Sequence, residues 1–146
     1  MDINVLSKAE VYCARSEHCE QEVRNKLYAW GADINQIDEI IDNLIDNGYI
    51  SSERYCRAFV HDKVLFQSWG REKIRAALAA KRLPLNDIKS ALKDFPQDEY
   101  MQVLQRLAEK KMKEYKENEA DVAEAKLINY LLARGFTYKE LQQLER

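Results

Sequence analysis

Residues 48–83 read GYISSERYCRAFVHDKVLFQSWGREKIRAALAAKRL, and this stretch predicts the fold. It contains a turn glycine, a serine suited to capping a helix, a helical pattern, a second glycine and a second helical pattern. In the second pattern Ile74, Leu78 and Lys81 follow the i, i+4, i+7 spacing of one helical face. The stretch therefore predicts two consecutive helices joined by a tight turn.

The same spacing recurs on both sides of this stretch. A copy lies 51 residues earlier and another lies 53 residues later, and a third helical pattern follows each copy. A period near 50 residues indicates one supersecondary unit used three times. The recurring residues are Val23, Leu27 and Trp30, then Ile74, Leu78 and Lys81, then Leu127, Leu131 and Arg134.

Two of these three helices are followed by glycine, at Gly31 and Gly135, and then by a nonpolar residue. Glycine at this place adopts the left-handed conformation that ends many helices, and the nonpolar residue covers the cap. The central copy has Lys81-Arg82-Leu83 at the same point.

The sequence therefore predicts an all-α protein of three tandem three-helix repeats, over residues 1–48, 49–96 and 97–146. Four glycines, two prolines and 33% charged residues agree with an almost wholly helical chain. The expected helix caps are Ser16, Asp33 and either Ser51 or Ser52. Inward-facing stripes are expected to include Ile34 in the first repeat and Phe66 in the second.

Charge is distributed unevenly although the net charge is only −2. Residues 1–50 carry four Lys and Arg against ten Asp and Glu, whereas residues 63–82 carry six basic residues and the single acid Glu72. The whole molecule is thus not a polycation that binds nucleic acid indiscriminately. An acidic end and a basic middle indicate a partner that is recognised locally.

The three cysteines are an odd number in a chain without a signal peptide or a membrane-spanning apolar run. We therefore expect a protein of the reducing cytoplasm, with no membrane contact. Cys13, His18 and Cys19 could be imagined as a zinc site, but their spacing matches no common ligand pattern and no fourth ligand is evident. Half-buried thiols beside a surface histidine are the simpler interpretation.

Residues for catalysis are scarce. The chain has two histidines and lacks a P-loop, a glycine-rich dinucleotide turn, an HExxH motif and paired CxxC motifs. His61 lies among polar neighbours, as a solvated histidine would. The row Asp33, Asp38, Asp42 and Asp46 is the water-facing side of a helix whose other side is apolar. We expect no enzyme activity, no metal and no cofactor.

The basic middle is the candidate binding surface. At 100° per residue, Arg71, Arg75 and Arg82 fall within about 40° of one another, beside the apolar stripe rather than opposite it. Such a shoulder lets guanidinium groups reach phosphates or acidic side chains of a partner while the helix stays packed. The alternative is an ordinary solvated face. The candidate partner-binding residues are Arg57, Lys63, Arg71, Lys73, Arg75, Lys81 and Arg82.

Aromatic residues accompany this basic cluster. Tyr55, Phe59, Phe66 and Trp69 could stack on bases, but their spacing along one stripe favours packing into the core.

The order of these features resembles the RecX family of regulatory proteins. In the central repeat, the similar features are Gly48 followed by a hydrophobic residue, an acid before Tyr55, Phe59-Val60, Trp69-Gly70, and Ile74 with Leu78. In the first repeat, Arg15-Ser16 followed by Glu22-Val23 and Leu27 is similar to the family pattern. The resemblance covers nearly the whole chain, and Arg82 departs from it where many members have glycine.

The resemblance implies an elongated, curved array in the bacterial cytoplasm, without catalytic residues. It also implies that the partner is the RecA recombinase: RecX proteins bind RecA, lodge in the groove of its filament on single-stranded DNA, and inhibit or disassemble it. Recombination, ATP hydrolysis and repressor co-cleavage would thereby be restrained. We expect a monomer with at most weak direct contact to DNA. The alternative is a helical protein that binds nucleic acid without RecA.

Overall fold

The computed structural model describes residues 2–145, so that Met1 and Arg146, the ends of the first and third predicted repeats, lie outside the described residues. Nine α-helices and no strands are present in this part of the chain, which confirms the predicted fold class. The helices are α1 Ile3–Arg15, α2 Glu20–Ala29, α3 Ile37–Asp46, α4 Ser52–Gln67, α5 Arg71–Ala80, α6 Leu85–Asp94, α7 Gln97–Glu114, α8 Ala120–Ala133 and α9 Tyr138–Leu141.

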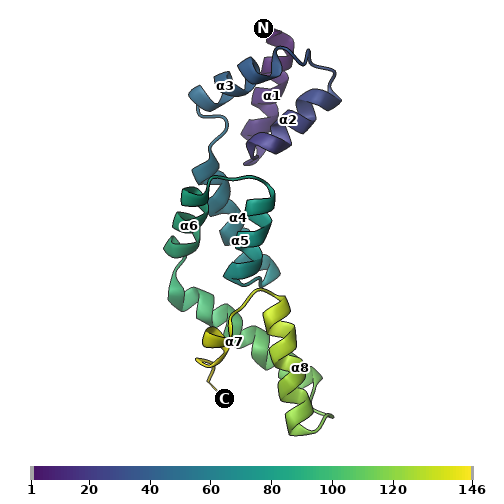
Figure 1. Cartoon of the computed structure of the whole chain (residues 1–146), viewed down its shortest axis with the longest axis vertical. Helices are drawn as coiled ribbons and strands as arrows, with labels where there is room; N and C mark the ends of the chain where they lie inside the picture. The colour runs from purple at the N-terminus through teal and green to yellow at the C-terminus, as the bar shows by residue number, and fades with distance from the viewer. Residues whose placement is uncertain (1, 146) are drawn as a thin grey trace.

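The helices form three units that follow one another along the long axis of the molecule (Figure 1). We refer to α1–α3 as repeat 1, to α4–α6 as repeat 2 and to α7–α9 as repeat 3. The N-terminus lies at one end of an elongated, curved array, and α8 reaches the opposite end (Figure 1). Repeat 3 differs from the others because its third helix, α9, has only four residues.

The second helix of every repeat ends in the same way. The residue after the cap is left-handed, and the next amide donates to a carbonyl five residues back, which is the Schellman arrangement. Arg82 adopts this conformation without being glycine, with φ of 64°, and so ends α5 by the same device as its neighbours. The three bonds are Ala32 N to Leu27 O at 3.0 Å, Leu83 N to Leu78 O at 3.2 Å and Phe136 N to Leu131 O at 3.1 Å.

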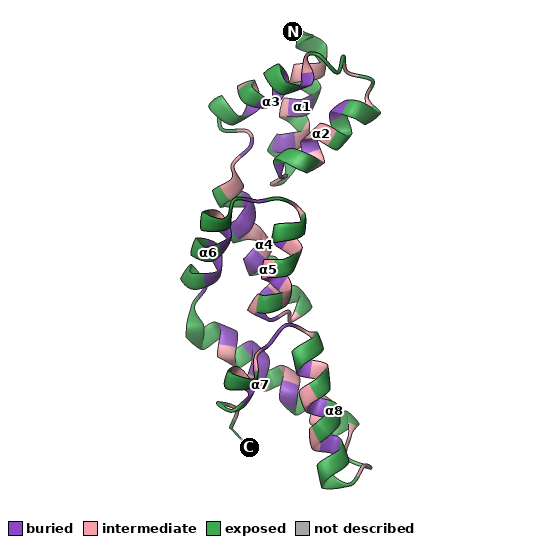
Figure 2. Cartoon of the chain, in the orientation of Figure 1, coloured by how far each residue is buried: buried purple, intermediate pink, exposed green. Residues whose placement is uncertain are grey.

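The buried residues, coloured purple on the ribbon in Figure 2, belong to two separate cores. Repeat 1 has its own core, built around Leu27, Ile41 and Leu44. Repeats 2 and 3 share a single larger core, which contains both Leu78 of α5 and Leu127 of α8. The array therefore consists of one small body and one two-repeat body.

Some local predictions were wrong because the helices begin and end at other residues. Helix α3 begins at Ile37, and the Asp33 carboxylate instead accepts from the Asn35 amide in a turn that precedes it. Ile34 is consequently 67% exposed rather than buried. Cys19, not Ser16, is the N-cap of α2. Ser51 was predicted correctly, since its hydroxyl accepts from the Arg54 amide at 3.2 Å.

Two turns join repeats 2 and 3 backbone to backbone. The Gly70 amide donates to the Arg134 carbonyl at 2.8 Å, and the Glu72 amide donates to the Gly135 carbonyl at 3.0 Å. A Cβ at Gly70 would lie 2.2 Å from the carbonyl carbon of Gly135, a distance that no side chain tolerates. Glycine is therefore required at Gly70 by this close approach rather than by its own φ of −81°.

The two tryptophans report on the two cores. Trp30 packs against the core of repeat 1, and Trp69 packs against the core shared by repeats 2 and 3. We expect the single-tryptophan variants Trp69→Phe and Trp30→Phe to show different urea midpoints by fluorescence, with repeat 1 unfolding first because its core is smaller. Transitions that coincide would contradict the division into two bodies.

Gly70→Ala should be far more damaging than alanine at an open glycine. The added methyl group must push two turns apart, which costs about 3 kcal/mol. Gly31→Ala is the matched control: no atom lies within 4 Å of its added Cβ, so only the left-handed backbone opposes it, at about 1 kcal/mol. Urea unfolding measures the loss of stability in Gly70→Ala and in Gly31→Ala. Equal losses would show that the contact between the two turns does not require a residue without a side chain at position 70.

Candidate functional site

The seven predicted basic residues lie in different surroundings. Lys63 and Lys73 converge on one aromatic ring. Arg57 and Arg75 are paired with acids, and Arg71 is directed into the junction between repeats 2 and 3. Lys81 and Arg82 border the junction between repeats 1 and 2.

Lys63 and Lys73 hold their ammonium groups over the indole of Trp69. Their Nζ atoms lie 4.7 Å and 4.4 Å from the ring centroid, which is cation–π geometry. Neither lysine forms an ion pair with any residue between 2 and 145. The two positive charges are therefore fixed in place by the ring and remain available to a partner.

Two phenylalanines extend this arrangement along α4. Phe59 lies 5.3 Å from Lys63 Nζ and contacts Trp69 edge to face, with ring centroids 6.4 Å apart. Phe66 follows Phe59 by seven residues on the same side of the helix. It is 74% exposed, so the prediction that it faces the core was wrong. We call Phe59, Lys63, Phe66, Trp69 and Lys73 the lysine–tryptophan surface.

The junction between repeats 2 and 3 holds this surface in position. Lys73 lies so close to Gly135 that a Cβ on the glycine would be 2.5 Å from the lysine Cβ. The Trp69 amide donates to the Lys63 carbonyl at 3.0 Å, and Ser68, which precedes it, is left-handed with φ of 53°. A surface that is rigid before binding loses less conformational entropy when a partner docks.

Lys81 adjoins two recesses at the junction between repeats 1 and 2. One recess, of about 420 Å³, is also lined by His18, Phe59 and Lys63, and thus adjoins the lysine–tryptophan surface. The other, of about 360 Å³, is also lined by the exposed Arg82. Lys81 and Lys63 thus line the same recess.

Arg57 and Arg75 are neutralised locally. Arg57 donates to the Asp94 carboxylate at 2.8 Å, and this hydrogen bond raises the pKa of its guanidinium group. Arg75 lies 3.6 Å from the Glu72 carboxylate, three residues earlier on α5. Both pairs are solvent-exposed and weak, so each arginine can still exchange its acid for another.

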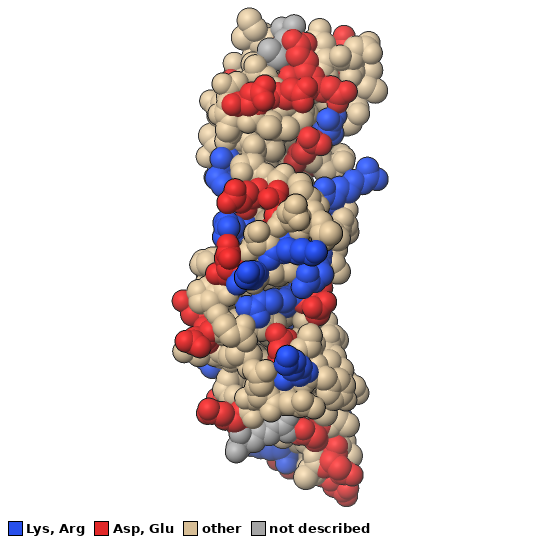
Figure 3. Space-filling view, turned by 60° about the vertical axis from the view of Figure 1, so that its left-hand side comes forward, with Lys and Arg blue, Asp and Glu red and all other residues tan. Residues whose placement is uncertain are grey.

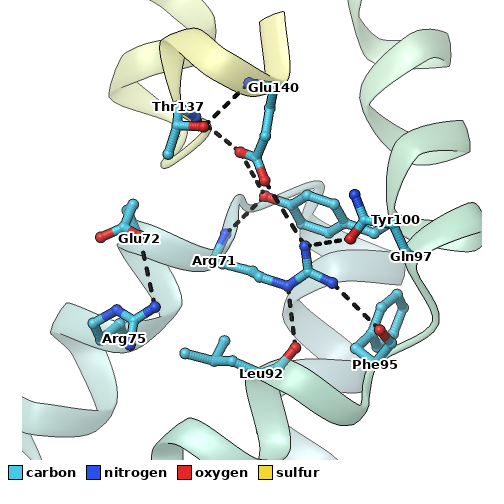
Figure 4. A network of polar contacts seen from close by, with 9 residues as sticks. All are labelled: Arg71, Glu72, Arg75, Leu92, Phe95, Gln97, Tyr100, Thr137 and Glu140. Atoms are coloured by element: carbon cyan, nitrogen blue, oxygen red, sulfur yellow. Dashed lines mark hydrogen bonds and ion pairs between the residues drawn. The ribbon is translucent and has the colours of Figure 1, made fainter. Parts of the chain in front are cut away.

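Arg71 has an internal role (Figure 4). Its guanidinium stacks 3.9 Å from the ring centroid of Tyr100 and lies 3.8 Å from the Glu140 carboxylate. The Tyr100 hydroxyl accepts from the Arg71 amide and donates to Glu140. The remaining guanidinium bonds go to the Leu92 carbonyl at 3.1 Å, the Gln97 side chain at 2.9 Å and the Phe95 carbonyl at 3.3 Å.

The sequence predicted that Arg71 reaches outward from the edge of its helix, and this network shows that it points into the junction instead. Its side chain is only 17% exposed, and its donors are used within the chain. Burial raises the pKa of Tyr100, as does the Glu140 carboxylate, whereas the Arg71 amide and charge lower it. The tyrosine therefore stays protonated and can donate to Glu140. Arg71 is a residue that holds repeat 2 to repeat 3.

The cysteines are free and buried. Burial is the main cause that raises the pKa of all three thiols, to about 11 for Cys56. Over residues 2–145, no group of three or more His, Cys, Asp or Glu side chains is arranged to hold a metal. None of the described helices is both long and apolar enough to span a membrane.

Charge is arranged along the body as the sequence predicted. On the face in Figure 3, lysine and arginine gather across the middle, and acidic side chains form a band near the N-terminal end. The molecule is an extended array of helical repeats, and its described residues do not converge on a reactive centre. Arrays of this kind offer extended surfaces suited to binding another macromolecule.

Comparison with known proteins identifies the family. The first, second and third three-helix domains of RecX match residues 6–44, 53–92 and 98–143 respectively. The chain belongs to the RecX family, which confirms the resemblance.

Its relatives are named as regulatory proteins. The chain is 28% identical to regulatory protein RecX of Leptothrix cholodnii, over 99% of this chain and 88% of that protein. It is 30% identical to regulatory protein RecX of Clostridium botulinum, over 85% of this chain but only 58% of the relative. The crystal structure of RecX from Lactobacillus salivarius has the same fold, with a TM-score of 0.84 at 24% identity over 95% of this chain and 90% of that one.

Arg71→Met should destabilise the two-repeat body. Removing the guanidinium breaks its ion pair with Glu140 and leaves the Leu92 and Phe95 carbonyls without this donor, which costs about 2–3 kcal/mol. The matched control Arg75→Met, on the same helix, removes only an exposed pair and should cost less than about 0.5 kcal/mol. Urea unfolding followed by Trp69 fluorescence measures both, and a harmless Arg71→Met would refute the internal role.

Proposed function

We propose that this protein is a non-enzymatic regulator that binds RecA and the RecA filament on single-stranded DNA. In this proposal it restrains the recombinase and co-protease activities of RecA, and so modulates DNA repair and recombination. It acts as a cytoplasmic monomer and needs no cofactor. Membership of the RecX family supports the regulatory role, and the lysine–tryptophan surface is the observation that supports binding.

The chemistry of this surface suits an acidic protein partner. Lys63 and Lys73 offer two unpaired positive charges, and the ring of Phe66, which is 74% exposed, offers apolar area that a partner can cover. Aromatic residues with cations beside them are typical of the energetic centre of an interface. Arg75, Lys81 and Arg82 extend the proposed contact, as does Arg57 after exchange of its acid.

The elongated shape suggests how binding could inhibit. A body three repeats long can contact neighbouring protomers of a filament at once. Filament subunits that change their relative position during ATP turnover would then have to break contacts with this protein. Occupancy therefore opposes the motion without any chemical step.

The same surface supports a second candidate, a protein that binds single-stranded nucleic acid without RecA. Aromatic rings flanked by lysines are a known platform for bases and phosphates. The acidic repeat 1 favours RecA, because ten Asp and Glu within residues 1–50 repel a nucleic-acid backbone. A salt titration separates the two, since binding to bare DNA would fall steeply with salt.

Charge reversal at the surface should abolish binding to the filament. We expect Lys63→Glu/Lys73→Glu to weaken binding by at least about 100-fold, since two charge pairs become repulsive. The control Lys8→Glu/Lys26→Glu makes the same change in net charge at two lysines that also stack on rings, in repeat 1. The measurement is a pull-down on RecA filaments assembled with single-stranded DNA and a nonhydrolysable nucleotide, with free RecA and bare DNA alongside.

Binding of Lys63→Glu/Lys73→Glu to the filament as strong as that of the parent protein would contradict the proposal. Equal loss in both double variants would show that overall charge, not this surface, governs binding. Circular dichroism should be unchanged in both.

Phe66 should contribute apolar contact. Phe66→Ala removes a ring that is 74% exposed, so stability should not fall, but filament binding should weaken by about tenfold. Ile34→Ala is the control, because Ile34 is a similarly exposed apolar residue in repeat 1. Phe66 would be excluded from the contact if both substitutions weakened filament binding equally, or if neither weakened it.

A further inference from the structure

The two junctions of the array are built from equivalent turns. In each, the N-cap residue of the second helix of one repeat faces the turn that ends the second helix of the next repeat. Between repeats 2 and 3 these residues are Gly70 and Gly135. Between repeats 1 and 2 they are Cys19, which precedes Gly70 by 51 residues, and Arg82, which precedes Gly135 by 53. Cys19 and Arg82 line one recess.

Glycine at both places makes the second junction tight. The turns are joined by two backbone hydrogen bonds, of 2.8 Å and 3.0 Å, and a Cβ on either Gly70 or Gly135 would overlap the opposite turn. The Arg71 network and the shared core add to these bonds. Repeats 2 and 3 are thus held by backbone, side chains and core together.

The first junction lacks both glycines. Cys19 carries the Cβ that Gly70 lacks, so the turn at Arg82 cannot approach it as the turn at Gly135 approaches Gly70. Within residues 2–145, no backbone hydrogen bond joins residues 16–22 to residues 78–84. Two recesses, of about 360 Å³ and 420 Å³, lie between the repeats there.

What joins repeat 1 to repeat 2 is a small set of contacts. The Cys19 side chain is buried in the core of repeat 2, and the Glu17 carboxylate accepts from Arg54 at 3.1 Å in a largely exposed pair. Gly48 has φ of 78°, but Tyr49 and Ile50 after it still pack with the core of repeat 1, so the chain crosses between the repeats at Ile50–Ser51. Side chains add to the contacts there: Arg54 also donates to the Gly48 carbonyl at 2.7 Å, and Tyr55 lies beside Glu22 and Cys19. No backbone hydrogen bond accompanies these contacts, so they hold the angle between the repeats less firmly than the second junction does.

We propose that repeat 1 is a hinged arm, which pivots as a rigid unit at the Ile50–Ser51 link relative to a rigid body formed by repeats 2 and 3. The separate core of repeat 1 lets it move without unfolding. Its motion changes the position of the acidic repeat relative to the lysine–tryptophan surface. The recess lined by His18, Lys63 and Lys81 opens or closes with the pivot. This inference does not depend on which macromolecule the protein binds.

Residual dipolar couplings of the free protein test the hinge directly. In a weakly aligning medium, amides of repeats 2 and 3 should fit one alignment tensor, and amides of repeat 1 should require a second, smaller tensor because the arm averages over several orientations. A single tensor that fits residues 2–145 would overturn the proposal.

A matched variant tests whether the lack of glycine at positions 19 and 82 lets repeat 1 move. Cys19→Gly/Arg82→Gly gives the first junction the glycine pair of the second, so the two turns can close. We expect the tensor of repeat 1 to move toward that of repeats 2 and 3. A variant whose two tensors differ as much as those of the parent protein would reject the role assigned to Cys19 and Arg82.

Discussion

The close contact between the turn at Gly70 and the turn at Gly135 holds repeats 2 and 3 in one fixed arrangement. Two backbone hydrogen bonds form there only because neither residue has a side chain. Arg71, immediately after the first turn, then reaches the ends of α6 and α9 and fixes the relative angle of the repeats. A linear array buries less apolar surface than a globule, so such specific junctions must supply its rigidity.

The proposed binding surface depends on this contact. Trp69 immediately precedes Gly70, and Lys73 lies against Gly135, so the contact that joins the repeats also fixes the ring and one of its two lysines. The other lysine, Lys63, comes from α4. Residues 51–146 carry 19 Lys and Arg against 15 Asp and Glu, whereas residues 1–50 carry four against ten, so the two-repeat body is net positive and repeat 1 is net negative. This separation suits a regulator that recognises a polymer by shape and charge.

Features that are local and repeated could be predicted from the sequence. The surroundings of a residue could not be predicted where they depend on contacts made by distant parts of the chain. The three repeats and the glycine ends of α2 and α8 were predictable because each leaves its pattern in consecutive residues. Arg71 was misplaced because helical periodicity locates a shoulder but does not show that α6, α7 and α9 cover it. Phe66 was assigned to the core by its stripe, yet residues 65–67, at the end of α4, are exposed. The role of Gly70 needs the position of Gly135, 65 residues away.

Hydrogen exchange of this protein, free and bound to RecA filaments on single-stranded DNA, locates the contact along the chain. We expect amide protection on binding to be concentrated in residues 59–75, around the lysine–tryptophan surface, and the junction at Gly135 to be protected already in the free protein. No change at residues 59–75 despite binding, or protection confined to repeat 1, would contradict the proposed surface.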